Sequence, residues 1–433
     1  MSKEVKDMST EAREKVEASL REALLRCNKC GFCLAHCPIY KATGVEWATA
    51  RGRITLIRSA LLDHQLELSD IEDPVFNCLT CTACVDDCPG GVQTADIIFS
   101  VREELVRQRG QPWLERLLFH RLLPYPSRVH AVSKLLRLVD VAGLRAAARK
   151  TGLMKVLGDA GKAEIMMSKV PPGGGLDDLI QLTKKIENPK YRVAYFVGCF
   201  APNFAPGEAA ATIRVLHKHQ VEVIVPEFVC CGLPAAGYGD MPTARSLAHT
   251  NIDIASKLNV DAIVTACASC SAFLKEYSKH LADEPEWAEK AKEFSSKVRD
   301  ISEFLVEIGL VTEMGTIKKK VTWHDPCHLG RYQKIKTQPR TILKSIPGVE
   351  FVEMTEADIC CGAAGTYGFT HYDLSQEVLS RKMGNVEKTS ADILVSSCPA
   401  CVMQLSSGVT QRKIPMRVLE IVELLDHAYK TAK

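Results

Sequence analysis

Short runs of apolar, mostly β-branched residues recur in the second half of the chain, and each run ends at a cysteine. The runs RVAYFVGC, VEVIVPEFVCC and DAIVTAC lead into Cys199, into Cys230 and Cys231, and into Cys267. Such runs are typical of buried strands, and the stretches 208–219 and 242–258 between them have helical spacing. The strand–helix–strand order predicts parallel strands joined by right-handed crossovers.

The same arrangement is repeated toward the C-terminus. The runs KKVTWHDPC, VEFVEMTEADICC and ADILVSSC end at Cys327, at Cys360 and Cys361, and at Cys398. A further cysteine three positions later closes each copy, at Cys270 and Cys401, and 373–388 is a helical stretch. Glycine follows each Cys–Cys pair, at Gly232 and Gly362, where it predicts a positive φ or a close backbone approach.

Because the carboxyl ends of parallel strands meet at one edge of a sheet, the ten cysteines are predicted to converge into two sites. We name them after their Cys–Cys–Gly motif: CCG site 1 (Cys199, Cys230, Cys231, Cys267, Cys270) and CCG site 2 (Cys327, Cys360, Cys361, Cys398, Cys401). Five thiolates are too many for one zinc ion or one simple cubane, which favours a larger or unusual iron–sulfur group. A single structural metal on four cysteines stays open for one copy. His324 and His328 flank Cys327, and each is interpreted as a structural hydrogen-bonding residue or a proton donor.

The N-terminal quarter of the chain has helical periodicity instead. Residues 10–26, with Thr10 as the predicted cap, place Val16, Leu20 and Leu24 at helical spacing. Residues 47–62 predict a second helix, which we expect to pack beside the metal sites of this region.

Two cysteine runs of identical spacing, C-x2-C-x2-C-x3-C-P, lie in this quarter. Three cysteines at this spacing present their thiolates to one [4Fe-4S] cubane, and the fourth reaches the other cubane. We predict cluster 1 on Cys27, Cys30, Cys33 and Cys88, and cluster 2 on Cys37, Cys78, Cys81 and Cys84. A zinc site needs only four ligands in C-x2-C pairs, so it leaves the third cysteine, the proline and the duplication unexplained.

Composition and the N-terminal sequence indicate the cellular location of the protein and the kinds of partner it can bind. The 433 residues are 46% hydrophobic and 25% charged, as in ordinary globular proteins, and the net charge of +3 is too small to indicate nucleic acid. The N-terminus lacks the apolar region of a signal peptide, and no apolar run approaches the length of a spanning helix. We therefore expect a cytoplasmic location, including the cytoplasmic face of a membrane, where the eighteen cysteines stay reduced and bind metal.

A basic segment at 105–156 contains eleven Arg or Lys residues against two acids. Its leucines suggest amphipathic helices that break at Leu-Pro-Tyr-Pro, 123–126. We favour a helical linker with a solvated basic face and an apolar face that packs on the clusters. The alternative is docking on an anionic membrane surface or an acidic partner. The Pro-Pro-Gly-Gly-Gly run at 171–175 marks a boundary.

These patterns predict a multidomain α+β protein of four segments. Residues 1–110 form a helical ferredoxin-like domain with two [4Fe-4S] clusters, and 111–190 a basic amphipathic helical linker. Two tandem α/β CCG domains with parallel sheets follow, at 191–315 and 316–433.

The motifs carry a resemblance that covers nearly the whole chain. They are CGFCLAHCPIY, ARGRI (50–54), CLTCTACVDDCPGGV, LLPYP and HDPCHLGR (324–331). Together with the paired CCG domains, they resemble the iron–sulfur subunits of glycolate oxidase and related D-lactate dehydrogenases. The chain is also similar to the D protein of heterodisulfide reductase and to the C protein of anaerobic glycerol-3-phosphate dehydrogenase.

The resemblance implies an electron-transfer subunit of an FAD-linked dehydrogenase for a 2-hydroxyacid, glycolate or D-lactate. The chain has no G-x-G-x-x-G after a strand, so the FAD is expected on a partner subunit, and this chain is not expected to act alone. Electrons would pass through the two clusters to the CCG sites and then to a quinone, a membrane subunit or an electron-transfer protein. The alternative is a catalytic subunit of the heterodisulfide reductase type, which reduces a disulfide at a CCG-bound cluster. A scaffold with structurally inert clusters is a third interpretation, which the two complete CCG copies disfavour.

Overall fold

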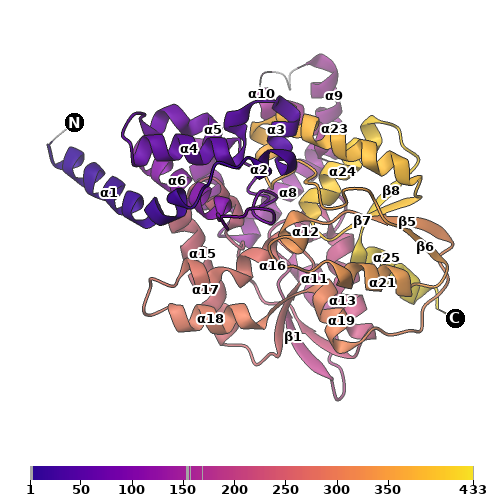
Figure 1. Cartoon of the computed structure of the whole chain (residues 1–433). Coiled ribbons are helices and arrows are strands. Elements are labelled where there is room, and N and C mark those ends of the chain that lie inside the picture. The colour runs from indigo at the N-terminus through magenta and orange to yellow at the C-terminus, as the bar shows by residue number, and fades with distance from the viewer. Residues whose placement is uncertain (1–2, 153–155, 157, 168, 433) are drawn as a thin grey trace.

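The computed structural model describes residues 3–152, 156, 158–167 and 169–432 (Figure 1). The N-terminal helices, in indigo, lie on the opposite side of the molecule from the C-terminal sheet, in orange and yellow. The predicted class is confirmed, since a helical N-terminal region precedes two parallel four-stranded sheets.

The N-terminal region is entirely helical between its cysteine loops. Its elements are α1 (Lys3–Leu25), α2 (Phe32–His36), α3 (Pro38–Thr43), η1 (Glu46–Ala48), α4 (Ala50–Leu61), η2 (Leu68–Ile71), α5 (Glu72–Phe76) and α6 (Thr94–Arg109). Helix α1 packs on α4 and α6 through a core that includes Leu24, Ile57 and Ile98. The predicted cap at Thr10 is wrong, because α1 begins seven residues earlier, at Lys3. Thr49 is a true cap, since its Oγ1 accepts from the amide of Gly52 at 3.0 Å at the start of α4.

The basic segment forms a chain of short helices. They are α7 (Trp113–Arg116), the π-helical turn η3 (Leu117–Leu122), α8 (Pro126–Val141) and α9 (Leu144–Thr151), followed by α10 (Gly158–Ala163), η5 (Glu164–Met166) and α11 (Leu176–Leu182). The predicted break at 123–126 is confirmed, because Pro126 starts α8. Lys155, one of the eleven basic residues, lies outside the described residues.

The apolar face of this segment is only partly packed. Phe119 is fully buried, whereas Leu114, Leu135 and Leu138 are 59%, 61% and 65% exposed. The favoured prediction that this face packs inward is therefore wrong for much of the stripe. Among the described residues, no helix is both long and apolar enough to span a bilayer.

The two CCG halves have the same sheet topology. The first has β1 (Tyr191–Tyr195), β2 (Val221–Ile224), β3 (Ala262–Thr265) and β4 (Val298–Asp300) in the order β2-β1-β3-β4. The second has β5 (Lys319–Trp323), β6 (Val349–Val352), β7 (Ile393–Ser396) and β8 (Arg417–Glu420) in the order β6-β5-β7-β8. All described pairings are parallel, as the sequence predicts. The edge strands β4 and β8 were not predicted.

Helices flank both sheets. The first half contributes α12 (Ala201–Phe204), α13 (Pro206–Lys218), α14 (Leu233–Gly237), α15 (Met241–Ser256), α16 (Ala268–Lys275), α17 (Tyr277–His280), α18 (Ala288–Lys297) and α19 (Ile301–Ile308). The second contributes α20 (Cys327–Gly330), α21 (Thr337–Ser345), α22 (Tyr367–Thr370), α23 (Tyr372–Thr389), α24 (Pro399–Gln411) and α25 (Ile421–Lys430).

The two halves pack on each other reciprocally. Helix α13, which follows the first strand of its sheet, packs on α25, which follows the last strand of the other sheet. Helices α21 and α19 make the same contact with the halves exchanged. One hydrophobic core includes residues of both halves, such as Val193 and Trp323, and Arg214 forms a bidentate ion pair with Asp426 across the contact. The halves are therefore related by an approximate two-fold arrangement.

The N-terminal region is fixed to both halves by hydrogen bonds. Arg102 of α6 is 5% exposed, and its guanidinium donates to the carbonyls of Val75, Phe76 and Cys78 and to that of Gly237, the last at 2.8 Å. The hydroxyl of Tyr332, from the second half, donates to the carbonyl of Thr80 at 2.8 Å. These bonds hold a cysteine loop of the N-terminal region against the CCG halves.

We predict that Arg102→Met destabilises the protein by about 3 kcal/mol or more, because four carbonyls lose a charged, buried donor at once. Thermal unfolding of the purified chain measures this effect, with Arg21→Met, at an exposed position, as the matched control. An equal and small change in both variants would contradict the prediction.

Candidate metal centres

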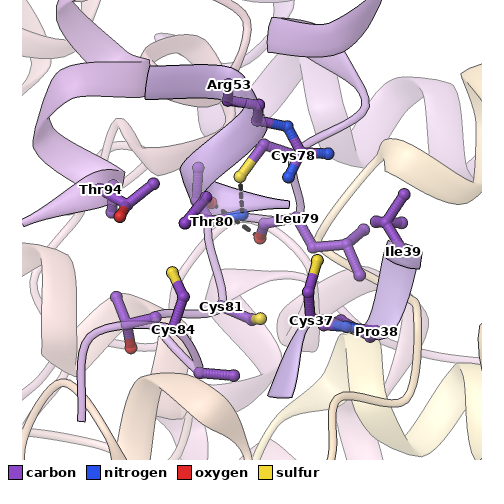
Figure 2. Close-up of a pocket in the computed structure, with 14 residues that line it drawn as sticks. Cys37, Pro38, Ile39, Arg53, Cys78, Leu79, Thr80, Cys81, Cys84 and Thr94 are labelled. Atoms are coloured by element: carbon purple, nitrogen blue, oxygen red, sulfur yellow. Dashed lines mark hydrogen bonds between the residues drawn. The ribbon is translucent and has the colours of Figure 1, made fainter. Parts of the chain in front are cut away.

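Four cysteines predicted for cluster 2 line one cavity. Figure 2 shows the sulfurs of Cys37, Cys78, Cys81 and Cys84 around a common space. Cys37 precedes α3, and the other three lie on the loop after α5. The amide of Thr80 donates to the Cys78 sulfur at 3.4 Å, and burial raises the pKa of Cys37 and of Cys84. Buried cysteines in such a cavity are protonated when no metal is bound, and a bound metal stabilises their thiolate forms.

Four cysteines predicted for cluster 1 line a second cavity. These are Cys27, Cys30, Cys33 and Cys88, and Cys84 also lines this cavity, so the two spaces adjoin. Backbone amides donate to the sulfurs here as well, from Arg51 to Cys33 at 3.4 Å. All eighteen cysteines are described, and every one is a free thiol. Two adjoining cavities, each with four unpaired thiols, fit a pair of [4Fe-4S] groups.

The five thiols of each CCG site also lie together. In site 1, hydrogen bonds from Cys230 and Cys270 lower the pKa of Cys231 to about 5. In site 2, hydrogen bonds from Cys360 and Cys401 lower the pKa of Cys361 well below its usual range. The central cysteine of each site is thus favoured as a thiolate, the form that binds metal, and in site 2 the pKa of Cys398 is lowered as well.

The glycines after the Cys–Cys pairs adopt the predicted positive φ, 96° at Gly232 and 87° at Gly362. A Cβ at Gly362 would lie 2.6 Å from the carbonyl oxygen of Ser375. A Cβ at Gly232 would lie 3.1 Å from that of Ala244. The close approach is therefore to the helices α23 and α15, which press the Cys–Cys turns against the sheets.

The four cysteine sets are not separate. Cys81 and Cys360 lie in one buried cluster, and the neighbouring Cys360 thiol raises the pKa of Cys81 well above its usual range, so cluster 2 adjoins CCG site 2. A hydrogen bond from Cys267 lowers the pKa of Cys398 and joins the two CCG sites. The thiols thus run in the order cluster 1, cluster 2, site 2, site 1. Sequence reasoning missed this order, because both contacts link residues more than one hundred positions apart.

The two histidines of the HDPCH motif differ in their contacts. His328 follows the structural interpretation, since its Nδ1 lies 3.1 Å from the hydroxyl of Ser269. His324 does not, because it is 1% exposed and neither ring nitrogen has a hydrogen-bond partner among the described residues. A ring nitrogen of His324 lies within 4.8 Å of the sulfurs of Cys361 and Cys401. Burial lowers the pKa of His324 to about 3, so the imidazole is neutral.

Sequence reasoning also missed Lys382, a fully buried lysine of α23. Its Nζ donates to the carbonyls of Glu356 and Ala357 at 3.0 and 2.8 Å, in the loop that leads to Cys360. Burial lowers the pKa of Lys382 to about 8, so it is a cation at neutral pH. The available signal was the helical spacing of Lys382 from Val378, Leu379 and Val386, which places a lysine on the buried side of α23.

Comparisons with known proteins match most of the chain. Three family models match: "4Fe-4S dicluster domain" at 23–92, "Glycolate oxidase iron-sulfur subunit, linker region" at 110–167, and "Cysteine-rich domain" (CCG) at 193–275 and 321–406. A probable glycolate oxidase iron–sulfur subunit of Bacillus subtilis is 33% identical, over 98% of this chain and 97% of the relative.

Two further relatives have comparable coverage. The glycolate oxidase iron–sulfur subunit of Escherichia coli is 30% identical over 96% of this chain and 98% of its own. The D protein of the dihydromethanophenazine:CoB–CoM heterodisulfide reductase of Methanosarcina mazei is 29% identical over 93% of each chain.

We predict that Gly362→Ala lowers the unfolding midpoint and the metal content of CCG site 2, because the positive φ alone costs about 1–2 kcal/mol and the Cβ clashes with backbone. Gly365→Ala is the matched control, since Gly365 has a φ of 65° in the same loop but open space around its Cβ position. Differential scanning fluorimetry and iron analysis measure the difference. Equal losses in the two variants would mean that the contact with Ser375 does not matter.

Proposed function

The chain belongs to the family of glycolate oxidase iron–sulfur subunits, and from this premise we propose that it transfers electrons within an FAD-linked 2-hydroxyacid dehydrogenase. The proposed substrate is glycolate or D-lactate, and the FAD resides on a partner subunit. The observation that carries the proposal is the continuous series of four cysteine sets, because electron transfer through a protein requires redox centres that are close to one another.

Each set has a proposed occupant. Cys27, Cys30, Cys33 and Cys88 would hold one [4Fe-4S] cluster, and Cys37, Cys78, Cys81 and Cys84 the other. The two five-thiol CCG sites would each hold an iron–sulfur group, with zinc as the alternative in one of them. Iron–sulfur groups supply one-electron redox chemistry, which divides the two electrons of a flavin into single steps. Anaerobic metal and sulfide analysis separates the occupants, since zinc appears apart from iron.

The chain's own residues set the order of the centres. Cys84 lines both N-terminal cavities, Cys81 contacts Cys360, and Cys267 contacts Cys398. These contacts support a series with cluster 1 at one end and CCG site 1 at the other. Backbone amides that donate to Cys33 and Cys78 also stabilise these sulfurs as anions.

The partners would bind outside this series. The exposed stripe of α7 and α8, with Trp113 at 69% and Leu138 at 65% exposure, lies in a segment rich in arginine and lysine. Apolar and cationic groups together suit an acidic partner subunit or an anionic membrane surface, as in the alternative interpretation of the sequence. The proposed location is the cytoplasm or the cytoplasmic face of the membrane, where a quinone, a membrane subunit or an electron-transfer protein accepts the electrons.

We predict that glycolate or D-lactate reduces the clusters of the co-purified complex under anaerobic conditions, and that EPR spectroscopy detects the reduction. Cys401→Ala is expected to remove the signals of CCG site 2 while both cubanes are still reduced by substrate, because they lie earlier in the series. If no flavoprotein co-purifies and every hydroxyacid leaves the clusters oxidised, the proposal is wrong.

A second function is favoured by one contact. Cys267 and Cys398 join the two CCG sites, and the hydroxyl of Ser269 lies 3.4 Å from the Cys398 sulfur. Two adjoining redox sites suit a two-electron substrate such as a disulfide, and one relative is named as part of a heterodisulfide reductase.

If the chain reduces disulfides, Cys231→Ala and Cys361→Ala are each expected to abolish that activity while both cubane EPR signals persist. An assay with a mixed disulfide and a low-potential dye as the reductant measures it. Activity in both variants would exclude this function.

A further inference from the structure

We propose that the two CCG sites differ in reduction potential, and that His324 and Lys382 make CCG site 2 the stronger electron acceptor. The inference deepens the proposed function and rests on one part of it, that both CCG sites hold redox-active iron–sulfur groups. It is independent of the substrate and of the partner subunit.

The first difference between the sites is a ring three residues before the first cysteine. Phe196 occupies this position in site 1, and His324 occupies it in site 2. The register is the same, because the Phe196 amide donates to Val264 at 2.8 Å and the His324 amide donates to Val395 at 2.9 Å. Both side chains are buried, at 0% and 1% exposure. The repeat therefore places an imidazole in site 2 where site 1 has a hydrocarbon ring.

The imidazole of His324 forms no hydrogen bond with the described residues that would explain its burial. Both ring nitrogens lack partners, and an unsatisfied buried polar group costs about 1–3 kcal/mol. The sulfurs of Cys361 and Cys401 lie within 4.8 Å of a ring nitrogen, so a small rearrangement around a bound iron–sulfur group would bring an N–H to a sulfur. A neutral imidazole carries one N–H in either tautomer, and hydrogen bonds to the sulfurs of an iron–sulfur group are among the factors that set its potential. Such a bond stabilises the more negative, reduced state, and Phe196 offers none.

The second difference lies on the helix behind each Cys–Cys turn. Ala244 and Ser375 are equivalent, because each carbonyl faces the glycine of its turn, and seven residues later come Asn251 and Lys382. Asn251 donates to the carbonyl of Cys230 at 3.1 Å, as Lys382 donates to Glu356 and Ala357. Asn251 also accepts from the Val229 amide at 3.0 Å, so both side chains anchor the segment that leads into the Cys–Cys pair, but only the lysine brings a charge.

The charge of Lys382 is not cancelled by an ion pair. Among the described residues, no carboxylate oxygen forms a salt bridge with its Nζ. The carboxylates that act on it are each matched by an arginine, in the pairs Asp325–Arg340 at 2.7 Å and Asp358–Arg331 at 3.1 Å. A buried cation near the thiolates favours an added electron, because the interior screens charge poorly.

Two buried carboxyl groups, those of Glu208 and Glu420, also interact with Cys398 of site 2. Glu208 and Glu420 are 3% and 1% exposed, and burial raises the pKa of each well above its usual range. This shift favours the neutral acid form, which adds no negative charge beside site 2.

The difference in reduction potential determines which CCG site receives electrons first. Site 2 is the CCG site that contacts cluster 2, through Cys360 and Cys81. An electron that leaves the cubanes thus meets the stronger acceptor first, and site 1 fills only after site 2. The pair of CCG sites would then load two electrons in a fixed order.

An anaerobic redox titration of the purified holoprotein, with dithionite and mediators and followed by EPR, tests the proposal. His324→Phe copies site 1 into site 2, and it is expected to shift the higher of the two CCG midpoint potentials downward. His324→Gln keeps an N–H donor and is expected to retain most of the wild-type potential. The reciprocal Phe196→His is expected to raise the lower midpoint potential.

Iron and sulfide content and the cubane signals are the controls for intact loading. If His324→Phe loses the iron of site 2, the test rests on Phe196→His and on Lys382→Asn. Lys382→Asn is expected to lower the higher of the two CCG midpoint potentials. Unchanged midpoint potentials in these variants, or two CCG sites of equal potential in the wild type, would overturn the proposal. Because no hydroxyacid is used, this outcome is separate from a failure of the proposed function.

Discussion

The reciprocal packing of the two CCG halves is the contact on which the rest of the arrangement depends. Helices α13 and α25, and α19 and α21, bury a common core that includes Val193 and Trp323. Since each sheet carries its cysteines at the carboxyl ends of its strands, this packing brings Cys267 against Cys398. Each half alone would hold one CCG site of five thiols, and the two sites become neighbours only when the halves pack together. The N-terminal region then adds its own thiols at one end, where Arg102 and Tyr332 fix it in place.

Features that depend on local spacing, such as the cysteine motifs and the parallel strands, could be predicted from the sequence. Features that depend on how distant segments pack could not. The runs around Cys27 and Cys78 fall at two adjoining cavities because a tight loop can present its thiols only to a near neighbour. The parallel sheets follow from the alternation of strands and helices. Strands β4 and β8 lead to no cysteine, the feature that marked the other six strands in the sequence. The ligand assignments of the eighteen cysteines stay predictions.

The sequence also could not say which cysteines of different sets touch, or which way an amphipathic face turns. The contact of Cys81 with Cys360 depends on how the N-terminal region docks, and no pattern in the sequence encodes that. The leucines of α8 have the spacing of a buried face, yet Leu135 and Leu138 are exposed. Periodicity tells that a face is apolar, but not what covers it. The difference between Phe196 and His324 was visible in the repeat, but its meaning needed the burial and the unpaired nitrogens.

The exposed stripe of α7 and α8 has a practical consequence for handling the chain. Trp113, Leu114 and Leu138 leave an apolar surface in water. Full burial of an exposed leucine side chain contributes about 1.5–3 kcal/mol, and these side chains would gain the larger part of that when they are covered. A chain produced without its partners would cover this surface with a second copy of itself or with detergent. Aggregation during purification would then reflect a missing neighbour, and the remedy is co-expression rather than a change of buffer.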